Sequence, residues 1–319
     1  MTRRALLTAG LFAIASALAL AAPENPPPLE AFKAPLAAKA PLIAMTRVAT
    51  RVIAVGDYGV IVLSDDAGKT WRQASSVATR NVLTAVTMID ARQGYAVGHG
   101  GTVLRTVDGG ETWTRAYAAG PDVSLLAVWF ENPRHGIAAG AFGFAIATED
   151  GGQSWTRVAI GSGDDRDRHL NGIFALSDHS AVFIAAEAGT LFRSLDRGRT
   201  WSVLRLPYNG SMWGGIGLRN GVALVYGMRG HVLRILDQGR SWAELPSGTQ
   251  HSFTSGIELD DATVVLAGLG GALARTSADG QHLETTIRPD RRTYTALTAG
   301  APGEIVVASM NGAASQPLP

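Results

Sequence analysis

The chain of 319 residues contains no cysteine. This absence excludes disulfide bonds, thiolate metal sites, cysteine nucleophiles and a lipid-modified cysteine. Charge is also scarce: charged residues make up 17% and the formal net charge is +1, so the basic surplus typical of a nucleic-acid-binding protein is missing. Glycine, by contrast, supplies 38 residues and apolar side chains 46%, which favours a turn-rich β fold over a coiled coil or a disordered chain.

The first residues have the pattern of an export signal. Arg3 and Arg4 precede an apolar run over residues 5–22, and Ala19-Leu20-Ala21 offers the small side chains that a signal peptidase accepts. We therefore predict a cleavable signal peptide over residues 1–21 and an exported protein, in the periplasm or a thylakoid lumen and associated with a membrane. An uncleaved anchor and twin-arginine rather than Sec export stay open as alternatives.

Residues 22–41 are predicted to be a spacer. They hold six of the fourteen prolines, which favour extended backbone and lack an amide hydrogen. The folded part of the chain is therefore expected over residues 42–319.

An octet ending in tryptophan, with the pattern Ser/Thr-x-Asp-x-Gly-x-Thr/Ser-Trp, recurs along this part. The copies lie at residues 64–71, 106–113, 148–155, 194–201 and 235–242, and a decayed copy without tryptophan lies at 276–283. A glycine-rich turn lies twelve residues upstream of each tryptophan position, and its last residue recurs at Gly59, Gly101, Gly143, Gly189, Gly230, Gly271 and Gly312. The spacings of 42, 42, 46, 41, 41 and 41 residues define seven units.

A complete unit has four short strand patterns. In the second unit they cover residues 83–89, 95–97, 102–106 and 112–115, separated by intervals rich in Gly and Asp. A four-stranded sheet repeated every 40 to 45 residues or so is the period of a β-propeller. We predict an all-β, seven-bladed β-propeller with four-stranded antiparallel blades. The last unit ends after its third strand, so residues 29–38 are expected to supply the missing outer strand.

The tryptophan octet resembles the Asp-box, or bacterial neuraminidase repeat. Its aspartate can accept hydrogen bonds from amides of the turn, its glycine can adopt left-handed backbone, and its indole covers the hairpin. The box joins the third and fourth strands, on the opposite face from the glycine-rich turns, and we predict a structural rather than a catalytic role. The residues concerned are Asp66, Trp71, Asp108, Trp113, Asp150, Trp155, Asp196, Trp201, Asp237 and Trp242.

Beyond the boxes, the whole chain after the predicted signal peptide resembles the photosystem II assembly and stability factor family, most clearly at residues 94–113 (GYAVGHGGTVLRTVDGGETW). The resemblance implies a non-catalytic protein without a cofactor, which holds a membrane-protein partner during assembly. In a photosynthetic host the partner would be a photosystem subunit, and otherwise an envelope membrane protein such as a transporter. We expect the protein to be a monomer.

The partner is expected to bind the face that carries the glycine-rich turns and the connections between blades, because these segments meet at one end of the strands. Aromatic and arginine side chains are the usual anchors of interfaces. The candidates on this face are Tyr58, Arg80, His99, Phe142, Arg166, Arg168, His169, Glu187, Trp213, Arg229, His251, Arg291, Arg292 and Tyr294.

One insertion, residues 161–169, accounts for the longest unit and is dense in charge. Three carboxylates within four residues could hold calcium, but neighbouring arginines compensate them and no calcium-loop spacing appears, so we predict no metal site.

Two other function classes remain open. Asp-boxes also occur in sialidases, and Tyr58, Glu187, Arg229 and Arg292 include the residue types of such an active site, although the expected Phe/Tyr-Arg-Ile/Leu-Pro motif is missing. A passive glycan binder using Trp213 and Tyr208 is the third candidate. The sequence offers no HExxH pair, no Gly-x-Ser-x-Gly elbow and no phosphate loop, so we predict no enzyme.

Overall fold

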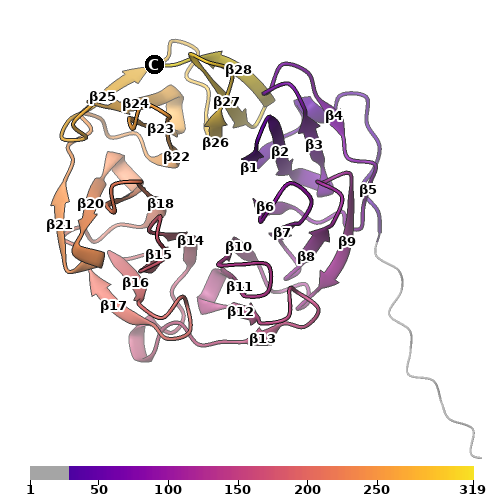
Figure 1. Cartoon of the computed structure of the whole chain (residues 1–319), viewed down its shortest axis with the longest axis horizontal. Coiled ribbons are helices and arrows are strands. Elements are labelled where there is room, and N and C mark those ends of the chain that lie inside the picture. The colour runs from indigo at the N-terminus through magenta and orange to yellow at the C-terminus, as the bar shows by residue number, and fades with distance from the viewer. Residues whose placement is uncertain (1–28) are drawn as a thin grey trace, which may run out of the picture.

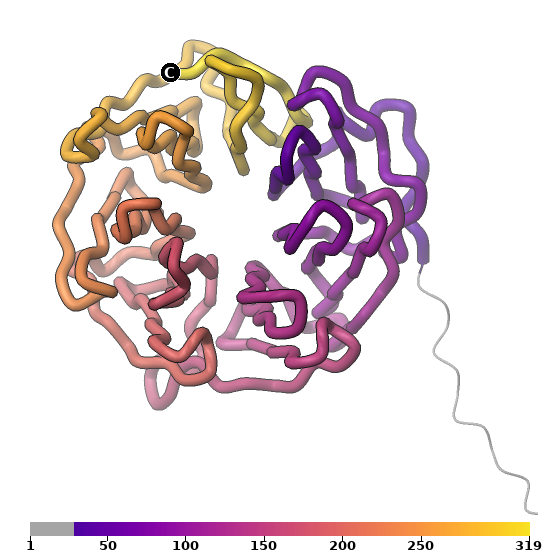
Figure 2. Tube along the Cα trace, viewed as in Figure 1, coloured from indigo at the N-terminus to yellow at the C-terminus, as the bar shows by residue number. Residues whose placement is uncertain are grey.

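The computed structural model describes residues 29–319, so the predicted signal peptide and the start of the spacer lie outside it. The described residues form seven sheets arranged as blades around a central axis (Figure 1, Figure 2). Their helices are seven single 3-10 turns, and none of them is long or apolar enough to cross a membrane. The predicted all-β, seven-bladed propeller is confirmed.

Each blade begins with its innermost strand and runs outwards (Figure 1). Blade 1 contains β1 (Leu42–Val48), β2 (Arg51–Gly56), β3 (Ile61–Ser64) and β4 (Arg72–Gln73), and blade 2 contains β6 (Leu83–Met88), β7 (Gly94–Gly98), β8 (Val103–Thr106) and β9 (Thr112–Tyr117) with the short parallel β5 (Ser76–Val77) outside it. Blade 3 contains β10 (Leu125–Phe130), β11 (Gly136–Gly140), β12 (Ala145–Thr148) and β13 (Thr156–Arg157), and blade 4 contains β14 (Leu170–Ala175), β15 (Val182–Ala186), β16 (Thr190–Ser194) and β17 (Ser202–Arg205). Blade 5 contains β18 (Met212–Gly217), β19 (Ala223–Gly227), β20 (Val232–Leu236) and β21 (Ser241–Glu244), blade 6 contains β22 (Phe253–Glu258), β23 (Val264–Gly268), β24 (Ala272–Thr276) and β25 (Leu283–Ile287), and blade 7 contains β26 (Tyr294–Ala299), β27 (Glu304–Ser309) and β28 (Gly312–Pro317).

The apolar core is divided into seven clusters, and each lies between two successive blades. Between blades 2 and 3, for example, Tyr95 stacks on Phe130 with ring centroids 4.2 Å apart and meets the edge of Trp155. A twisted blade cannot bury both faces by itself, so the repeat is stable only as a closed ring.

The ring closes differently from our expectation. Residues 29–38 add no strand to blade 7, which has three strands within the described residues. They run instead along the outer edges of blades 2 and 1, where the Ala31 amide donates to the Val77 carbonyl on β5 at 2.9 Å and the Gln73 side chain on β4 donates to the Phe32 carbonyl at 2.8 Å. They end in the 3-10 turn η1 (Ala37–Lys39), which packs against β28. Pro35 cannot donate to a strand partner, and Ala37 is buried in the cluster between blades 7 and 1. The expected closing strand is therefore wrong.

Inner strands hold the closure together. The Thr295 hydroxyl on β26 donates to the Leu42 carbonyl on β1 at 2.6 Å, and Arg47 on β1 donates to the Ala299 carbonyl at 2.7 Å. Packing and these polar contacts thus join the first blade to the last.

The Asp-box turns are built from side-chain hydrogen bonds. In blade 2 the Thr106 hydroxyl donates to Asp108 at 2.8 Å and accepts from the Gly110 amide at 2.9 Å. Asp108 accepts in turn from the Thr112 amide and hydroxyl, at 3.0 and 2.6 Å, and the Trp113 indole donates to the Gly110 carbonyl at 2.9 Å. The carboxylate contacts recur at Asp66, Asp150 and Asp196.

The fifth box is different. Ile235 occupies the position of the first hydroxyl residue, so the pair of bonds made by Thr106 has no equivalent. Asp237 has a left-handed φ of 48°, and within residues 29–319 its carboxylate accepts a hydrogen bond only from the Ser241 hydroxyl, at 2.9 Å. The amide bonds expected of Asp237 are therefore missing, because an isoleucine can neither donate to the carboxylate nor accept from the turn.

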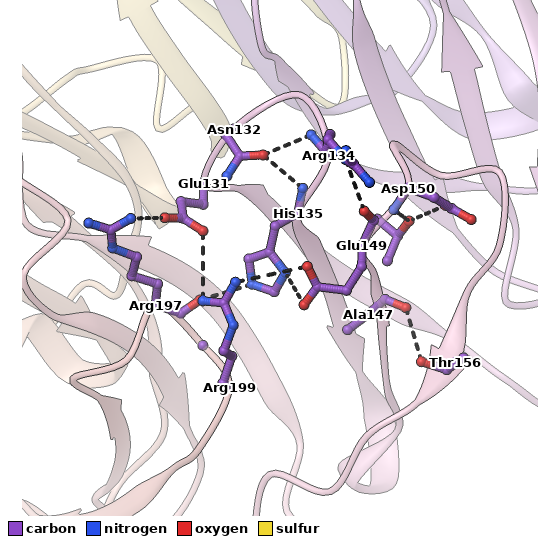
Figure 3. A network of polar contacts seen from close by, with 12 residues as sticks. Glu131, Asn132, Arg134, His135, Ala147, Glu149, Asp150, Thr156, Arg197 and Arg199 are labelled. Atoms are coloured by element: carbon purple, nitrogen blue, oxygen red, sulfur yellow. Dashed lines mark hydrogen bonds and ion pairs between the residues drawn. The ribbon is translucent and has the colours of Figure 1, made fainter.

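Side chains of the preceding blade also hydrogen-bond to the box turns of blades 2 to 5. The Tyr95 hydroxyl donates to the Gly151 carbonyl at 2.6 Å, and Arg51 donates to the Gly109 carbonyl at 2.9 Å. Figure 3 shows the same arrangement between blades 3 and 4: the buried His135 lies 2.9 Å from the Arg197 carbonyl oxygen through Nε2 and 3.0 Å from the Glu149 carboxylate through Nδ1. The boxes therefore link neighbouring blades as well as closing hairpins.

Candidate partner-binding face

The turns between the second and third strands of the blades lie on one face of the ring, which we call the turn face, and the Asp-boxes lie on the opposite box face. On the turn face each turn contacts the connection that leads to the next blade. The Gly143 amide donates to the Arg168 carbonyl at 2.9 Å, and the Gly101 amide donates to the Val123 carbonyl at 2.8 Å. Turns and connections therefore form one continuous surface.

The last glycine of the turn makes this contact possible. Gly143 has a φ of 63°, and a Cβ atom there would lie 1.8 Å from the Arg166 carbonyl oxygen. Gly312 in blade 7 meets Ala38 in the same way, at 2.0 Å, so η1 takes the place of an interblade connection. No larger residue fits either position.

In blades 1 to 6 the residue just before that glycine is left-handed as well, and at two of these positions a large aromatic side chain is exposed. Tyr58 has a φ of 53° and is 69% exposed, and Phe142 has a φ of 52° and is 67% exposed. Left-handed backbone costs a non-glycine residue about 1–2 kcal/mol. Gly100 and Gly270 occupy the same position in sister turns, so the turn itself does not require an aromatic side chain. Ala188 and Arg229 share the left-handed backbone in their turns, so this conformation belongs to the repeat, and the large exposed aromatic side chain is what distinguishes Tyr58 and Phe142.

Five candidates lie near the boundary of blades 3 and 4. The ring of Phe142 lies 4.7 Å from that of His169, and the His169 amide donates to Glu187 at 3.2 Å. Arg168 pairs with Asp165 at 2.6 Å, while Arg166 is exposed to solvent. These residues form a surface that combines an aromatic edge with charge of both signs.

The insertion that carries Arg166 and Arg168 contains a buried carboxylate whose negative charge is balanced by arginines. Asp165 is buried and is paired with Arg205 as well as with Arg168, each at 2.6 Å. The bond from Arg205 lowers the pKa of the Asp165 carboxyl against the opposing effect of burial. The best-placed carboxylate of the loop is thus already held by two guanidinium groups.

The remaining candidates of the turn face lie further round the ring. Arg291 lies 3.5 Å from the ring of His251, Arg292 lies 3.9 Å from Asp290, and the Arg229 amide donates to the Ser252 hydroxyl at 3.1 Å. On the other side, Arg80 packs over the ring of Phe32 near the exposed His99.

Two candidates do not belong to the turn face. Tyr294 is fully buried at the start of β26, where its hydroxyl donates to Gln316 at 3.2 Å and burial raises its pKa. It takes the position that Leu42 and Leu83 fill in other blades, the first residue of the innermost strand. Trp213 lies on β18 and lines a cavity of about 190 Å³ bounded by innermost strands. The assignment of Tyr294 to the surface is therefore wrong, and Trp213 is half-buried against the cavity rather than in a loop of the turn face, because both residues lie inside strands.

The residues of the sialidase-like alternative are dispersed. Tyr58 lies in blade 1, Glu187 in blade 4, Arg229 in blade 5 and Arg292 before blade 7. Within residues 29–319 no hydrogen bond or ion pair joins any two of them, and Glu187 is bound to the His169 amide. The geometry does not assemble a glycosidase centre from this set.

Sequence reasoning missed one feature of this face. Arg115 and Asn81 border a recess near Arg80, and neither was a candidate. The signal that could have found Arg115 is its place two residues after the box tryptophan, within the outer strand that runs from the box towards the turn face.

Comparison with known proteins gives a family match. A family model described as photosynthesis system II assembly factor YCF48 matches residues 74–204 and 120–244. The two matches together span residues 74–244, more than half of the 319 residues. Among curated proteins, none matches the chain.

Several solved structures share the architecture. One described as YCF48 bound to D1 peptide superposes with a TM-score of 0.70 at 15% identity, over 88% of this chain and 94% of that one. YCF48 from Cyanidioschyzon merolae gives 0.68 at 15% identity, over 88% and 96%. A streptogramin B lyase gives 0.73 at 12% identity, over 87% and 93%. Identities this low establish a common fold and leave the activity open.

Proposed function

Since the chain belongs to the photosynthesis system II assembly factor family, we propose that it is a non-catalytic assembly factor which holds a segment of a membrane protein on its turn face. The partner is a photosystem subunit in a photosynthetic host and an envelope membrane protein, such as a transporter, in another host. One structure of similar fold is described as bound to a peptide, which supports a peptide-binding role for the shared architecture.

The observation that carries the proposal is the pair of exposed, left-handed aromatic residues. Tyr58 and Phe142 present large apolar surfaces to solvent from backbone that glycine adopts at lower cost. Aromatic side chains bury much area for little loss of rotamer freedom, which makes them effective anchors in an interface. Nearby cationic and anionic groups can then fix the register of the bound segment.

The test replaces both aromatics by glycine. Tyr58→Gly with Phe142→Gly removes the anchors and relieves the left-handed strain, so we expect the melting temperature to stay within about 2 °C of the wild type, because relief of strain offsets the lost contacts. Capture of the partner from detergent-solubilised membranes, measured by affinity purification and mass spectrometry, should fall.

Ala188→Gly is the matched control, because Ala188 has the same backbone position and a φ of 52° but no large side chain. The proposal requires a membrane protein that co-purifies with the wild type and this control and is depleted with the double variant. Equal recovery with all three proteins would contradict it.

The proposal includes export. A signal peptide cleaved after Ala21 would release a chain that begins at Ala22. N-terminal sequencing of the protein purified from its host tests this point: an N-terminus at residue 22 supports cleavage, and an intact residue 1 supports an anchor.

A further inference from the structure

A recess of about 470 Å³ opens on the turn face beside blade 2. It lies between the turn of blade 2, the outer strand of the same blade and the connection from blade 1. Asn81 in the connection is hydrogen-bonded to the turn of blade 2: its side-chain amide donates to the His99 carbonyl and to the Thr102 hydroxyl, both at 3.0 Å. The recess is therefore a built part of the fold and not a gap between mobile loops.

The charge of this recess has one sign. Its lining includes Arg80, Arg115 and His99 and no carboxylate. Within residues 29–319, neither arginine forms an ion pair. Two guanidinium groups that face a recess without a counter-charge make a favourable site for an anion.

Arg80 is held in place before any ligand arrives. Its Nε donates to the Glu30 carbonyl at 2.7 Å, and its guanidinium lies 3.8 Å from the centre of the Phe32 ring. Its two Nη groups make no hydrogen bond within the described residues, whereas the Glu30 carboxylate lies near Ser76, at 3.1 Å. A pre-oriented arginine loses little side-chain entropy when it binds a planar carboxylate through both nitrogens.

Blade 5 provides an internal comparison. A recess of about 370 Å³ occupies the corresponding place beside its turn. There Glu244 stands two residues after the box tryptophan, the position that Arg115 has in blade 2, and it lies 3.7 Å from His231. In blade 5 the carboxylate of Glu244 therefore supplies a negative charge to the recess, whereas the charged side chains of the blade 2 recess are all cationic. The cationic lining is thus not needed to fold the blade.

We infer that the blade 2 recess binds a carboxylate group presented by an extended peptide. Leu29, Ala118 and Pro121 give the recess an apolar wall, which suits a peptide with an apolar residue beside its carboxylate. The peptide would be part of the partner, so the inference rests on the proposed function and assigns a charge requirement to the bound segment.

Peptide selection on the purified full chain tests the inference without knowledge of the partner. Random peptides are displayed in two libraries, one joined to its carrier at both ends and one with a free C-terminus. The wild type should enrich a Glu or Asp beside an apolar residue if a side chain supplies the carboxylate, or should select only from the free C-terminus library if the terminus supplies it.

Arg115→Glu reproduces the blade 5 residue and should abolish this preference. Arg92→Glu is the matched control, since Arg92 is exposed at the opposite end of blade 2 and its replacement changes the net charge equally. For a selected peptide, we expect Arg115→Glu to raise the Kd at least about tenfold. Arg92→Glu is the reference for the change in net charge of the protein, and the Glu→Gln form of the peptide is the reference for loss of the carboxylate.

Selection of peptides without a required carboxylate, or the same preference in Arg115→Glu, would overturn the inference. The proposed function would still stand in that case if the glycine variants of Tyr58 and Phe142 lost the membrane partner. If instead the carboxylate preference held and those variants kept the partner, the recess would be a peptide site and the aromatic anchors would be wrong.

Discussion

Replacement of Trp113 by alanine tests whether the Asp-boxes hold the blades together. The indole is 1% exposed, belongs to the cluster between blades 1 and 2, and donates to the Gly110 carbonyl at 2.9 Å. Loss of a buried tryptophan costs about 3–5 kcal/mol, and leaving the carbonyl without its donor adds about 1 kcal/mol. We therefore expect a loss of roughly 4–6 kcal/mol.

The expected shift in melting temperature follows from the size of the domain. An unfolding entropy of about 2.1 cal/mol/K per residue over about 290 described residues gives roughly 0.6 kcal/mol/K, so the loss corresponds to about 7–10 °C. Differential scanning calorimetry and urea unfolding measure it. Trp113→Phe is the control, because it keeps most of the apolar contact and should cost about a third as much. A shift below about 2 °C for the alanine variant would refute a packing role for the box.

Three further predictions concern the same framework. Tyr95→Phe removes the hydroxyl that donates to the box turn of blade 3 and should lower the free energy of unfolding in urea by about 1–2 kcal/mol. An unchanged free energy of unfolding would mean that this hydrogen bond between the blades does not stabilise the fold. Gly143→Ala should destabilise the fold by well over 1 kcal/mol, because the new Cβ would overlap a carbonyl oxygen. Gly163→Ala is the control, since Gly163 has a φ of 56° and open space around it, and this change should cost only the left-handed strain. Equal losses of stability in the two variants would contradict the close contact at Gly143. Hydrogen bonds from Ser154 lower the pKa of Asp150 to about 2. The stability that this carboxylate contributes is therefore complete above about pH 4 and is lost as the pH falls towards 2. A melting temperature that does not fall across this range would argue against the hydrogen-bonded carboxylate.

Glycine and the box residues made the architecture predictable. Each blade needs a glycine where a turn meets the next connection, as at Gly143, and these glycines set the count and spacing of the blades. The box needs a hydroxyl residue, an aspartate and a tryptophan in fixed order, as in blade 2. Local requirements of this kind are visible in a single sequence, since every residue involved lies within one unit.

The errors arose where distant segments decide the outcome. The path of residues 29–38 depends on the close contact between η1 and Gly312, where the absence of a side chain lets Ala38 approach the backbone. No local sequence pattern encodes a contact between segments so far apart. Tyr294 follows two arginines and looks like a loop residue, yet the register of β26 buries it. Arg80 and Arg115 are 35 positions apart and both line the recess, because the connection that carries Arg80 passes beside the outer strand of blade 2, so their recess could not be predicted from spacing.

The central claim is that the turn face contacts a membrane protein, and site-specific photocrosslinking in the native host tests it most directly. A benzoylphenylalanine residue is placed at position 58 or 142 on the turn face, and at position 107, an exposed valine in the box turn of blade 2, as the control. The account predicts that positions 58 and 142 crosslink to the same membrane protein and that position 107 does not. Crosslinks to a membrane protein from position 107 alone, or from none of the three positions, would contradict it.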